Sequence, residues 1–240
     1  MAAVQGKNLV KYYKKFKALN SVTFEIKEGE CFGFLGPNGA GKTTLMGMIY
    51  GFITPSEGEI EIFNQKFNKQ SLSEIKKRIG VIPQDNNLDP DLNVLENLIV
   101  YARYFDINKK KATQKAIELL EFVKLDDWIS INVRKLSGGM QRKLIFARGL
   151  INSPDLIMLD EPTTGLDPRS RRQIWEKIEV LKHSGKTLIL TTHYMEEAEK
   201  LCDRIAMMDK GKILVIDTPE NLSIKFGGNL EHVYLNMTEG

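Results

Sequence analysis

The chain has 240 residues, 42% of them hydrophobic, so it is long enough to bury the core of one large domain. Its 34 lysines and arginines nearly balance 31 aspartates and glutamates, and this formal charge of +3, without a basic stripe, argues against a nucleic-acid partner. Cys31 and Cys202 lie outside any CxxC or Cys/His grouping, which indicates two core thiols rather than a disulfide framework or a zinc site. No apolar run approaches the roughly 18 residues of a membrane-spanning helix, and residues 1–10 lack the apolar segment of a secretion signal.

Strand-like and helix-like stretches alternate along most of the chain, a pattern typical of an α/β fold in which helices cover a mainly parallel sheet. Residues 22–26 and 59–63 alternate apolar and polar side chains, as half-exposed strands do, and predict an antiparallel portion near the N-terminus. Continuous apolar runs bounded by turn residues or charge predict central strands at residues 31–35, 156–159 and 187–190. The expected sheet is therefore mixed.

A glycine-rich segment, GPNGAGKT, follows the first of these buried strands and precedes a helix-like stretch, residues 44–50, that is closed by Gly51. It matches the pattern GxxxxGK[ST], whose glycines let backbone N–H groups and a helix N-terminus face a polyphosphate. Lys42 adds a charge for the β and γ phosphates, and the Thr43 hydroxyl can ligate Mg²⁺. The alternative is a purely structural glycine-rich turn. The predicted phosphate-binding residues are Gly36, Pro37, Asn38, Gly39, Ala40, Gly41, Lys42, Thr43 and Thr44.

From about Asp85 to Ile151 the strand pattern stops and apolar residues recur at helical spacing. Asn93 followed three residues later by Glu96 predicts a helix N-cap with a reciprocal carboxylate, and Lys109–Lys111 indicates a solvated helix start rather than a binding site. The expected organisation is one domain, in which residues 1–84 and 152–240 form the core and residues 85–151 form an inserted helical subdomain.

The buried run at residues 156–159 ends in Asp160-Glu161-Pro162, which places two carboxylates at the C-terminal edge of a strand, where ligands of α/β sheets collect. We assign Asp160 to the Mg²⁺ sphere, through water, and Glu161 to the polarisation of an attacking water. Acidic strand ends are common, so this assignment depends on the phosphate loop upstream.

The segment LSGGMQ at residues 136–141 resembles the signature motif of the ATP-binding cassette (ABC) ATPase family, and it lies between the phosphate loop and the carboxylate pair as in that family. Ser137 can cap the following helix while the glycine N–H groups point outward, which creates a second anion site that cannot serve the same ATP. The resemblance implies that this site faces the ATP of a second copy, so that two subunits enclose two nucleotides head to tail. The implied signature residues are Leu136, Ser137, Gly138, Gly139, Met140 and Gln141.

The resemblance also implies roles for single side chains. Gln84 matches the glutamine that senses magnesium and the lytic water, so that the implied metal residues are Thr43, Gln84 and Asp160. Asp167 matches the loop that crosses the dimer interface, and His193 matches the histidine that hydrogen-bonds the γ phosphate and helps to position Glu161.

Adenine stacking in the family uses an aromatic side chain ahead of the first long strand. Tyr13 aligns best with it, and Tyr12 and Phe16 are close by. The alternative is that Tyr13 only packs at the sheet edge.

Residues 85–105, 192–204 and 230–238 resemble the exporter branch that handles drugs and lipo-oligosaccharides, including nodulation factors. Gly165, where many importers have alanine, weakens an importer assignment. The resemblance implies a P-loop NTPase core, the ligands ATP and Mg²⁺, and a homodimer or a heterodimer with a similar ATPase. It further implies a separate integral membrane permease that holds the chain at the cytoplasmic face of the membrane.

Three alternatives remain at this point: an importer ATPase, a soluble ABC ATPase acting on a partner other than a transporter, and a regulatory module without catalysis. A single cassette without a coiled-coil insertion argues against the second. The joint presence of Lys42, Gln84, Asp160, Glu161 and His193 argues against the third.

Overall fold

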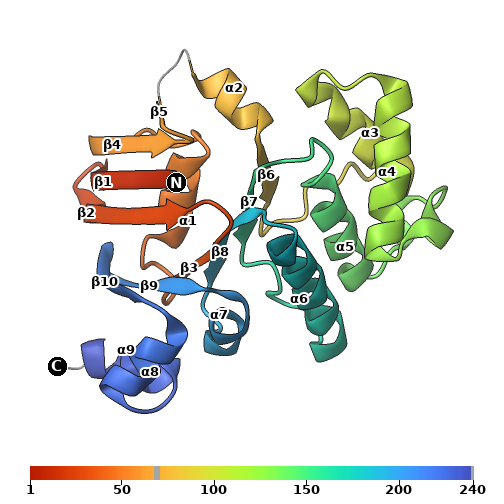
Figure 1. Ribbon diagram of the computed structural model, residues 1–240. Coiled ribbons are helices and arrows are strands. Elements are labelled where there is room, and N and C mark those ends of the chain that lie inside the picture. Colours follow the sequence, from red (N-terminus) through yellow and green to blue (C-terminus); the bar gives the residue numbers. More distant parts are fainter. Residues whose placement is uncertain (68–70, 239–240) are drawn as a thin grey trace. The chain divides into compact units, whose positions relative to one another are not determined.

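The structure is a computed structural model that describes residues 1–67 and 71–238 (Figure 1). It divides into two compact units, Met1–Lys76 with Leu181–Gly240, and Lys77–Val180. Among the described residues, none of the helices is both long enough and apolar enough to cross a bilayer.

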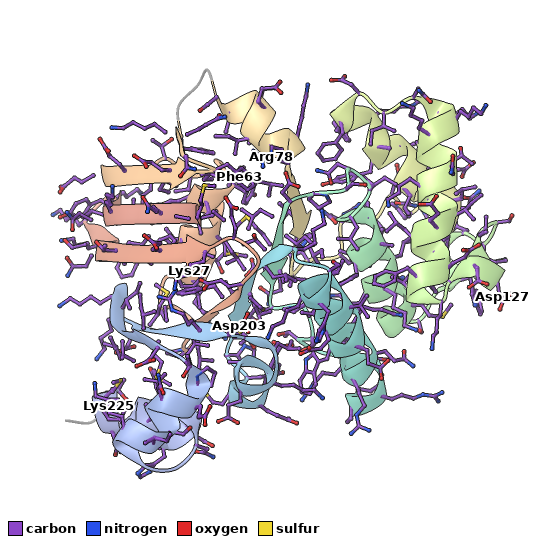
Figure 2. All side chains as sticks on the ribbon, viewed as in Figure 1. Lys27, Phe63, Arg78, Asp127, Asp203 and Lys225 are labelled. Atoms are coloured by element: carbon purple, nitrogen blue, oxygen red, sulfur yellow. The ribbon has the colours of Figure 1, made fainter. Side chains whose placement is uncertain are left out.

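An antiparallel sheet forms the N-terminal part of the first unit (Figure 1). Its order is β2-β1-β4-β5, and Figure 2 labels Lys27 at the end of β2 and Phe63 directly after β4. From Val22 to Lys27, buried and exposed residues alternate, as expected where one face of a strand meets a core. The predicted antiparallel portion is confirmed, although the strand between its two predicted members was missed. The strands are β1 (Ala2–Tyr13), β2 (Phe16–Lys27), β4 (Glu57–Ile62) and β5 (Gln65–Lys66).

A second group of strands in this unit has the order β10-β9-β3-β8. All five residues of β3 are buried, and β3 pairs in parallel with β8 and β9, while β10 is antiparallel to β9. The continuous apolar runs therefore predicted buried parallel strands correctly. The elements are β3 (Cys31–Leu35), α1 (Lys42–Ile49), α2 (Leu72–Lys77), β8 (Thr187–Thr192), α7 (Met195–Leu201), β9 (Arg204–Asp209), β10 (Lys212–Asp217), α8 (Pro219–Phe226) and α9 (Leu230–Thr238).

The two cysteines are buried free thiols, as predicted, but they are also neighbours in space. A hydrogen bond with the Cys31 thiol, together with burial, raises the pKa of the Cys202 thiol well above its ordinary value. The Cys31 N–H donates to the carboxylate of Asp203 over 2.9 Å, and that carboxylate also lies 2.8 Å from the amine of Lys182. The Cys202 thiol is therefore protonated at neutral pH, and both buried cysteines serve packing.

The second unit combines a parallel strand pair, β6 and β7, with helices. The N-cap of α3 is the predicted reciprocal box: the Glu96 N–H donates to Asn93 Oδ1 over 2.8 Å, and the Asn93 N–H donates to Glu96 Oε2 over 2.9 Å. Helix α4 begins at Lys109, as expected, with Asn108 as its cap. The elements are β6 (Ile79–Ile82), α3 (Val94–Ala102), α4 (Lys109–Val123), α5 (Gly138–Arg148), β7 (Leu156–Asp160) and α6 (Pro168–His183), with 3₁₀ turns at Arg103–Phe105, Asp126–Trp128 and Val133–Lys135.

Candidate functional site

The loop at residues 36–43 connects the buried strand β3 to helix α1. Glycine is required at Gly36, because an added Cβ would lie 2.2 Å from the carbonyl oxygen of Met208. It is also required at Gly41, where φ is +103° and an added Cβ would lie 2.7 Å from Leu19. Gly41 is the N-cap of α1 and has no side chain, so the first-turn N–H groups of the helix can serve an anion.

Lys42 is only 5% exposed. Its Nζ donates to the carbonyl oxygens of Gly36 over 2.7 Å and of Pro37 over 3.0 Å, which keeps the amine at the mouth of the loop. Thr43 and Thr44 follow in the first turn of α1. The loop therefore combines backbone donors, one ammonium and two hydroxyls, which together suit a polyphosphate.

His193 lies beside the start of this loop. Strands β3 and β8 pair with Leu35 opposite Thr192, and the Gly36 N–H donates to the Thr192 carbonyl over 3.4 Å. His193 directly follows Thr192, half-buried, with its ring centroid 4.2 Å from that of Tyr194. Because the carboxyl ends of parallel strands share one edge, the structure brings His193 and the phosphate loop together.

The aromatic candidates lie where β1 and β2 join. Tyr13 pairs with Phe16 across the two strands, and Tyr12 pairs with Lys17. All three rings are substantially exposed, and the Lys11 amine lies 5.4 Å from the Tyr13 ring centroid. They are therefore accessible to a planar ligand.

In the second unit, the structure brings Gln84 and Glu161 together. Gln84 Nε2 donates to Glu161 Oε2 over 3.3 Å, and Thr164 Oγ1 donates to the same oxygen over 3.1 Å. Glu161 follows the end of β7 at Asp160, is 7% exposed and has φ of +44°, a conformation that non-glycine residues adopt at some energetic cost. Sequence reasoning missed Thr164, because no local pattern shows that its hydroxyl turns back to this carboxylate.

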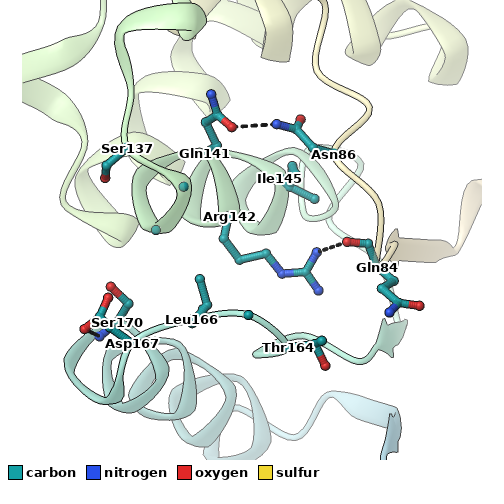
Figure 3. A pocket seen from close by; sticks show the side chains of 13 residues that line it. Gln84, Asn86, Ser137, Gln141, Arg142, Ile145, Thr164, Leu166, Asp167 and Ser170 are labelled. Atoms are coloured by element: carbon teal, nitrogen blue, oxygen red, sulfur yellow. Dashed lines mark hydrogen bonds between the residues drawn. The ribbon is translucent and has the colours of Figure 1, made fainter. Parts of the chain in front are cut away.

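Four residues of the predicted signature line a cavity of about 510 Å³ together with Gln84, Thr164 and Asp167, namely Ser137, Gly138, Gly139 and Gln141 (Figure 3). Ser137 caps α5 as predicted, with its Oγ accepting from the Met140 N–H over 3.3 Å. An added Cβ on Gly138 would meet nothing within 4 Å, so the main chain there is open to a ligand. Gln141 Oε1 accepts from Asn86 Nδ2 over 2.6 Å.

Asp167 is exposed at the edge of this cavity and holds the start of α6. Its Oδ1 accepts from the N–H groups of Arg169 and Ser170, both over 3.0 Å, and Pro168 stands at the first helical position. Hydrogen bonds from the Ser170 side chain and backbone lower the pKa of Asp167. The Asp-Pro pair is a helix-start signal that sequence reasoning could have used.

A phosphate loop after a buried strand, carboxylates after another strand and a glycine-rich helix start define a nucleotide-binding cassette of the P-loop class. A family model described as ABC transporter matches residues 19–164, more than half of the chain. The chain is 43% identical over 234 residues to the Nod factor export ATP-binding protein I of Cupriavidus metallidurans, covering 97% of this chain and 77% of that protein. It is 45% identical over 222 residues to the protein of the same name from Rhizobium etli, covering 92% and 70%.

Solved structures agree with this match. The dimeric post-hydrolysis ATP-binding cassette MJ0796, bound to ADP and Pi, is 31% identical with a TM-score of 0.81, covering 90% of this chain and 98% of that one. The cbiO1 protein of Clostridium perfringens, part of the ABC transporter complex cbiONQ, is 25% identical with a TM-score of 0.84, covering 93% and 91%.

The chain belongs to the family of ABC transporter ATP-binding subunits. It is an ATPase that resembles the nodulation-factor exporter branch. The predictions of family, fold class and ATPase activity are confirmed. The roles of the individual site residues, and the limits of the helical subdomain, stay predictions.

Proposed function

We propose that this chain is the ATPase subunit of an ABC-2-type exporter, in which closure and opening of a dimer over MgATP drives a separate membrane permease. The observation that carries the exporter assignment is the 43% identity, over 97% of the chain, to a protein named for Nod factor export. The importer alternative has no comparable relative in its favour among those described above.

The residues present fit a magnesium ion that arrives with its nucleotide. Within residues 1–67 and 71–238, no group of three or more His, Cys, Asp or Glu side chains gathers as a metal site. Mg²⁺ prefers oxygen ligands and is commonly held by one or two protein groups together with phosphate oxygens. Thr43, Gln84 and, through water, Asp160 would hold it, and the ion would neutralise charge on the β and γ phosphates.

In this proposal the phosphate loop binds the nucleotide, and Tyr13 stacks on its base. Glu161 polarises the attacking water, because its carboxylate is buried and held in one orientation by Gln84 and Thr164. His193 donates to the γ phosphate from the edge of β8.

The signature at residues 136–141 would bind the ATP of a second subunit, and Asp167 would lie in the loop that meets that subunit. The exposed main chain at Gly138 supports this role. The dimeric state of MJ0796 and the membership of cbiO1 in a transporter complex support a dimer and a membrane partner. The subunit would then be peripheral on the inner face of the membrane.

Replacing the proposed base tests the catalytic part of this proposal. We expect Glu161→Gln to lower turnover by about 100-fold or more, because a positioned base typically contributes factors of that order. ATP binding should persist, and ATP-bound dimers should accumulate in light scattering. Glu176→Gln, an exposed change on α6, should retain wild-type turnover. Near wild-type turnover in Glu161→Gln would contradict the assignment.

Affinity purification from solubilised membranes tests the transporter part. We expect a polytopic membrane protein to co-purify with the chain. Co-purification of ribosomes or DNA instead, without a membrane protein, would favour the soluble ABC ATPase.

A further inference from the structure

A buried arginine lies at the centre of the second unit's polar site and was not singled out from the sequence. Arg142 stands on α5, five residues after Ser137, and is 7% exposed. Figure 3 shows its side chain running from α5 toward Gln84.

The guanidinium donates to main-chain carbonyls of two separate segments. Nη1 donates to Pro83 and, over 3.1 Å, to Gln84, which follow β6. Nε and Nη2 donate to the segment that ends β7, with distances of 2.6 Å to Pro162, 3.2 Å to Glu161 and 3.3 Å to Asp160. One side chain with a rigid planar guanidinium therefore joins the signature helix to the main chain of both proposed catalytic groups.

The folding stability of the chain does not by itself explain why an arginine occupies position 142. Burying a cation requires that its donors are satisfied, and a well-packed apolar side chain of similar size often gives equal or greater stability. The guanidinium differs from an apolar side chain in that its five donors lie in one plane and hold several acceptors in defined positions at once. A lysine ammonium on its flexible stem does not do this.

We propose that Arg142 is a positioning residue for hydrolysis that couples the two nucleotide sites of the dimer. When the signature binds the partner's nucleotide, it fixes the position of α5 and therefore of Arg142. Arg142 in turn fixes the main-chain positions of Gln84 and Glu161 in this subunit's own site. This inference rests on the proposed roles of those two side chains. It explains why an arginine so close to the signature bonds to carbonyls rather than turning toward solvent.

The chain offers a matched control on the same helix. Arg148 is also 7% exposed, its Nη1 donates to the Asn87 carbonyl over 2.8 Å, and its Nη2 bonds the Asn87 side chain. Its guanidinium lies 4.8 Å from the ring centroid of Tyr101. It is thus equally buried, but its two acceptors on Asn87 belong to neither proposed catalytic segment.

The test compares Arg142→Met, Arg142→Lys and Arg148→Met in the full chain, with MgATP as the substrate. The measurements are kcat, KM and the Hill coefficient for ATPase activity, the Kd of a fluorescent ATP analogue, and the thermal unfolding midpoint. We expect Arg142→Met to lower kcat by about tenfold or more, since displacement of catalytic groups by an ångström costs factors of this order. Its Hill coefficient should fall toward one, while the Kd stays unchanged. Arg142→Lys should lie between wild type and Arg142→Met.

Arg148→Met should keep its kcat and its Hill coefficient, whatever it costs in the unfolding midpoint. The inference is overturned if Arg142→Met and Arg148→Met lose kcat equally, or if the loss in Arg142→Met is matched by an equal rise in Kd. If Arg142→Met does not fold, a wild-type kcat and Hill coefficient in Arg142→Lys overturn it instead. Failure of the proposed function is a separate result, because it would show as wild-type turnover in Glu161→Gln.

Discussion

The position of the Lys42 amine in the proposed nucleotide site is fixed by hydrogen bonds of this one side chain. It is nearly buried, yet its charge is directed by two carbonyls of its own loop, so the amine has a fixed position at the place where phosphate oxygens are expected. A point charge of this kind binds ground-state nucleotide, whereas Glu161 would act on the reaction. Substitution of Lys42 should therefore weaken nucleotide binding, whereas substitution of Glu161 should lower turnover.

We expect Lys42→Ala to weaken ATP binding by about 10- to 100-fold, the equivalent of one or two charge-assisted hydrogen bonds. A fluorescence titration with an ATP analogue measures this loss, with Lys27→Ala, an exposed change on β2, as the control. An unchanged Kd in Lys42→Ala, with lost turnover, would show that the lysine acts only on the transition state.

Local patterns predicted the glycine-rich loop before α1 and the Ser137 cap, because their geometry is set by a few consecutive residues. Thr164 and Arg142 could not be found in this way. Their partners come from other segments, and only the folded chain shows that a hydroxyl and a guanidinium turn toward residues 83–84 and 160–162.

At the scale of elements, continuous apolar runs and apolar/polar alternation predicted strands correctly where the backbone is regular. The fully buried β3 and the alternating half of β2 are examples. β1 was missed, because register shifts between Gly6 and Leu9 and between Leu9 and Lys11 break its alternation. In an irregular strand, the two-residue alternation of apolar and polar side chains is interrupted in the sequence, although the strand still pairs with its neighbours in the fold.

Helix α3 provides a prediction at this scale. Asn93→Ala removes one side of the capping box and should cost about 1 kcal/mol of unfolding free energy. For a domain of this size the unfolding midpoint should fall by about 2–4 °C. Asn93→Ser keeps a side-chain acceptor and should retain most of the stability. Equal midpoints for the two variants, measured by circular dichroism, would show that the cap contributes nothing.

At the scale of the whole molecule, each unit carries one of the two proposed anion sites. The phosphate loop lies in the first unit and the signature lies in the second, where the exposed main chain of Gly138 is accessible to another molecule. If the signature serves a partner's nucleotide, a single copy holds parts of two sites and completes neither.

Specific ATPase activity should therefore rise with protein concentration and level off when the chain is dimeric. Initial rates over a wide dilution series, with light scattering on the same samples, measure this directly. Activity that stays constant in samples proven to be monomeric would contradict the shared-site arrangement.

The pairing of β1 with β2 at the end of their hairpin also affects how substitutions would act on the proposed adenine-stacking site. Residues directly opposite in an antiparallel pair share a face, so Phe16 lies on the side of Tyr13, while Tyr12 points away with Lys17. The proposed stacking face therefore carries two exposed rings, Tyr13 and Phe16, instead of one. If the base stacks on this face as proposed, replacing Tyr13 or Phe16 alone should weaken adenine recognition less than replacing both, so that evolution could exchange either aromatic residue singly.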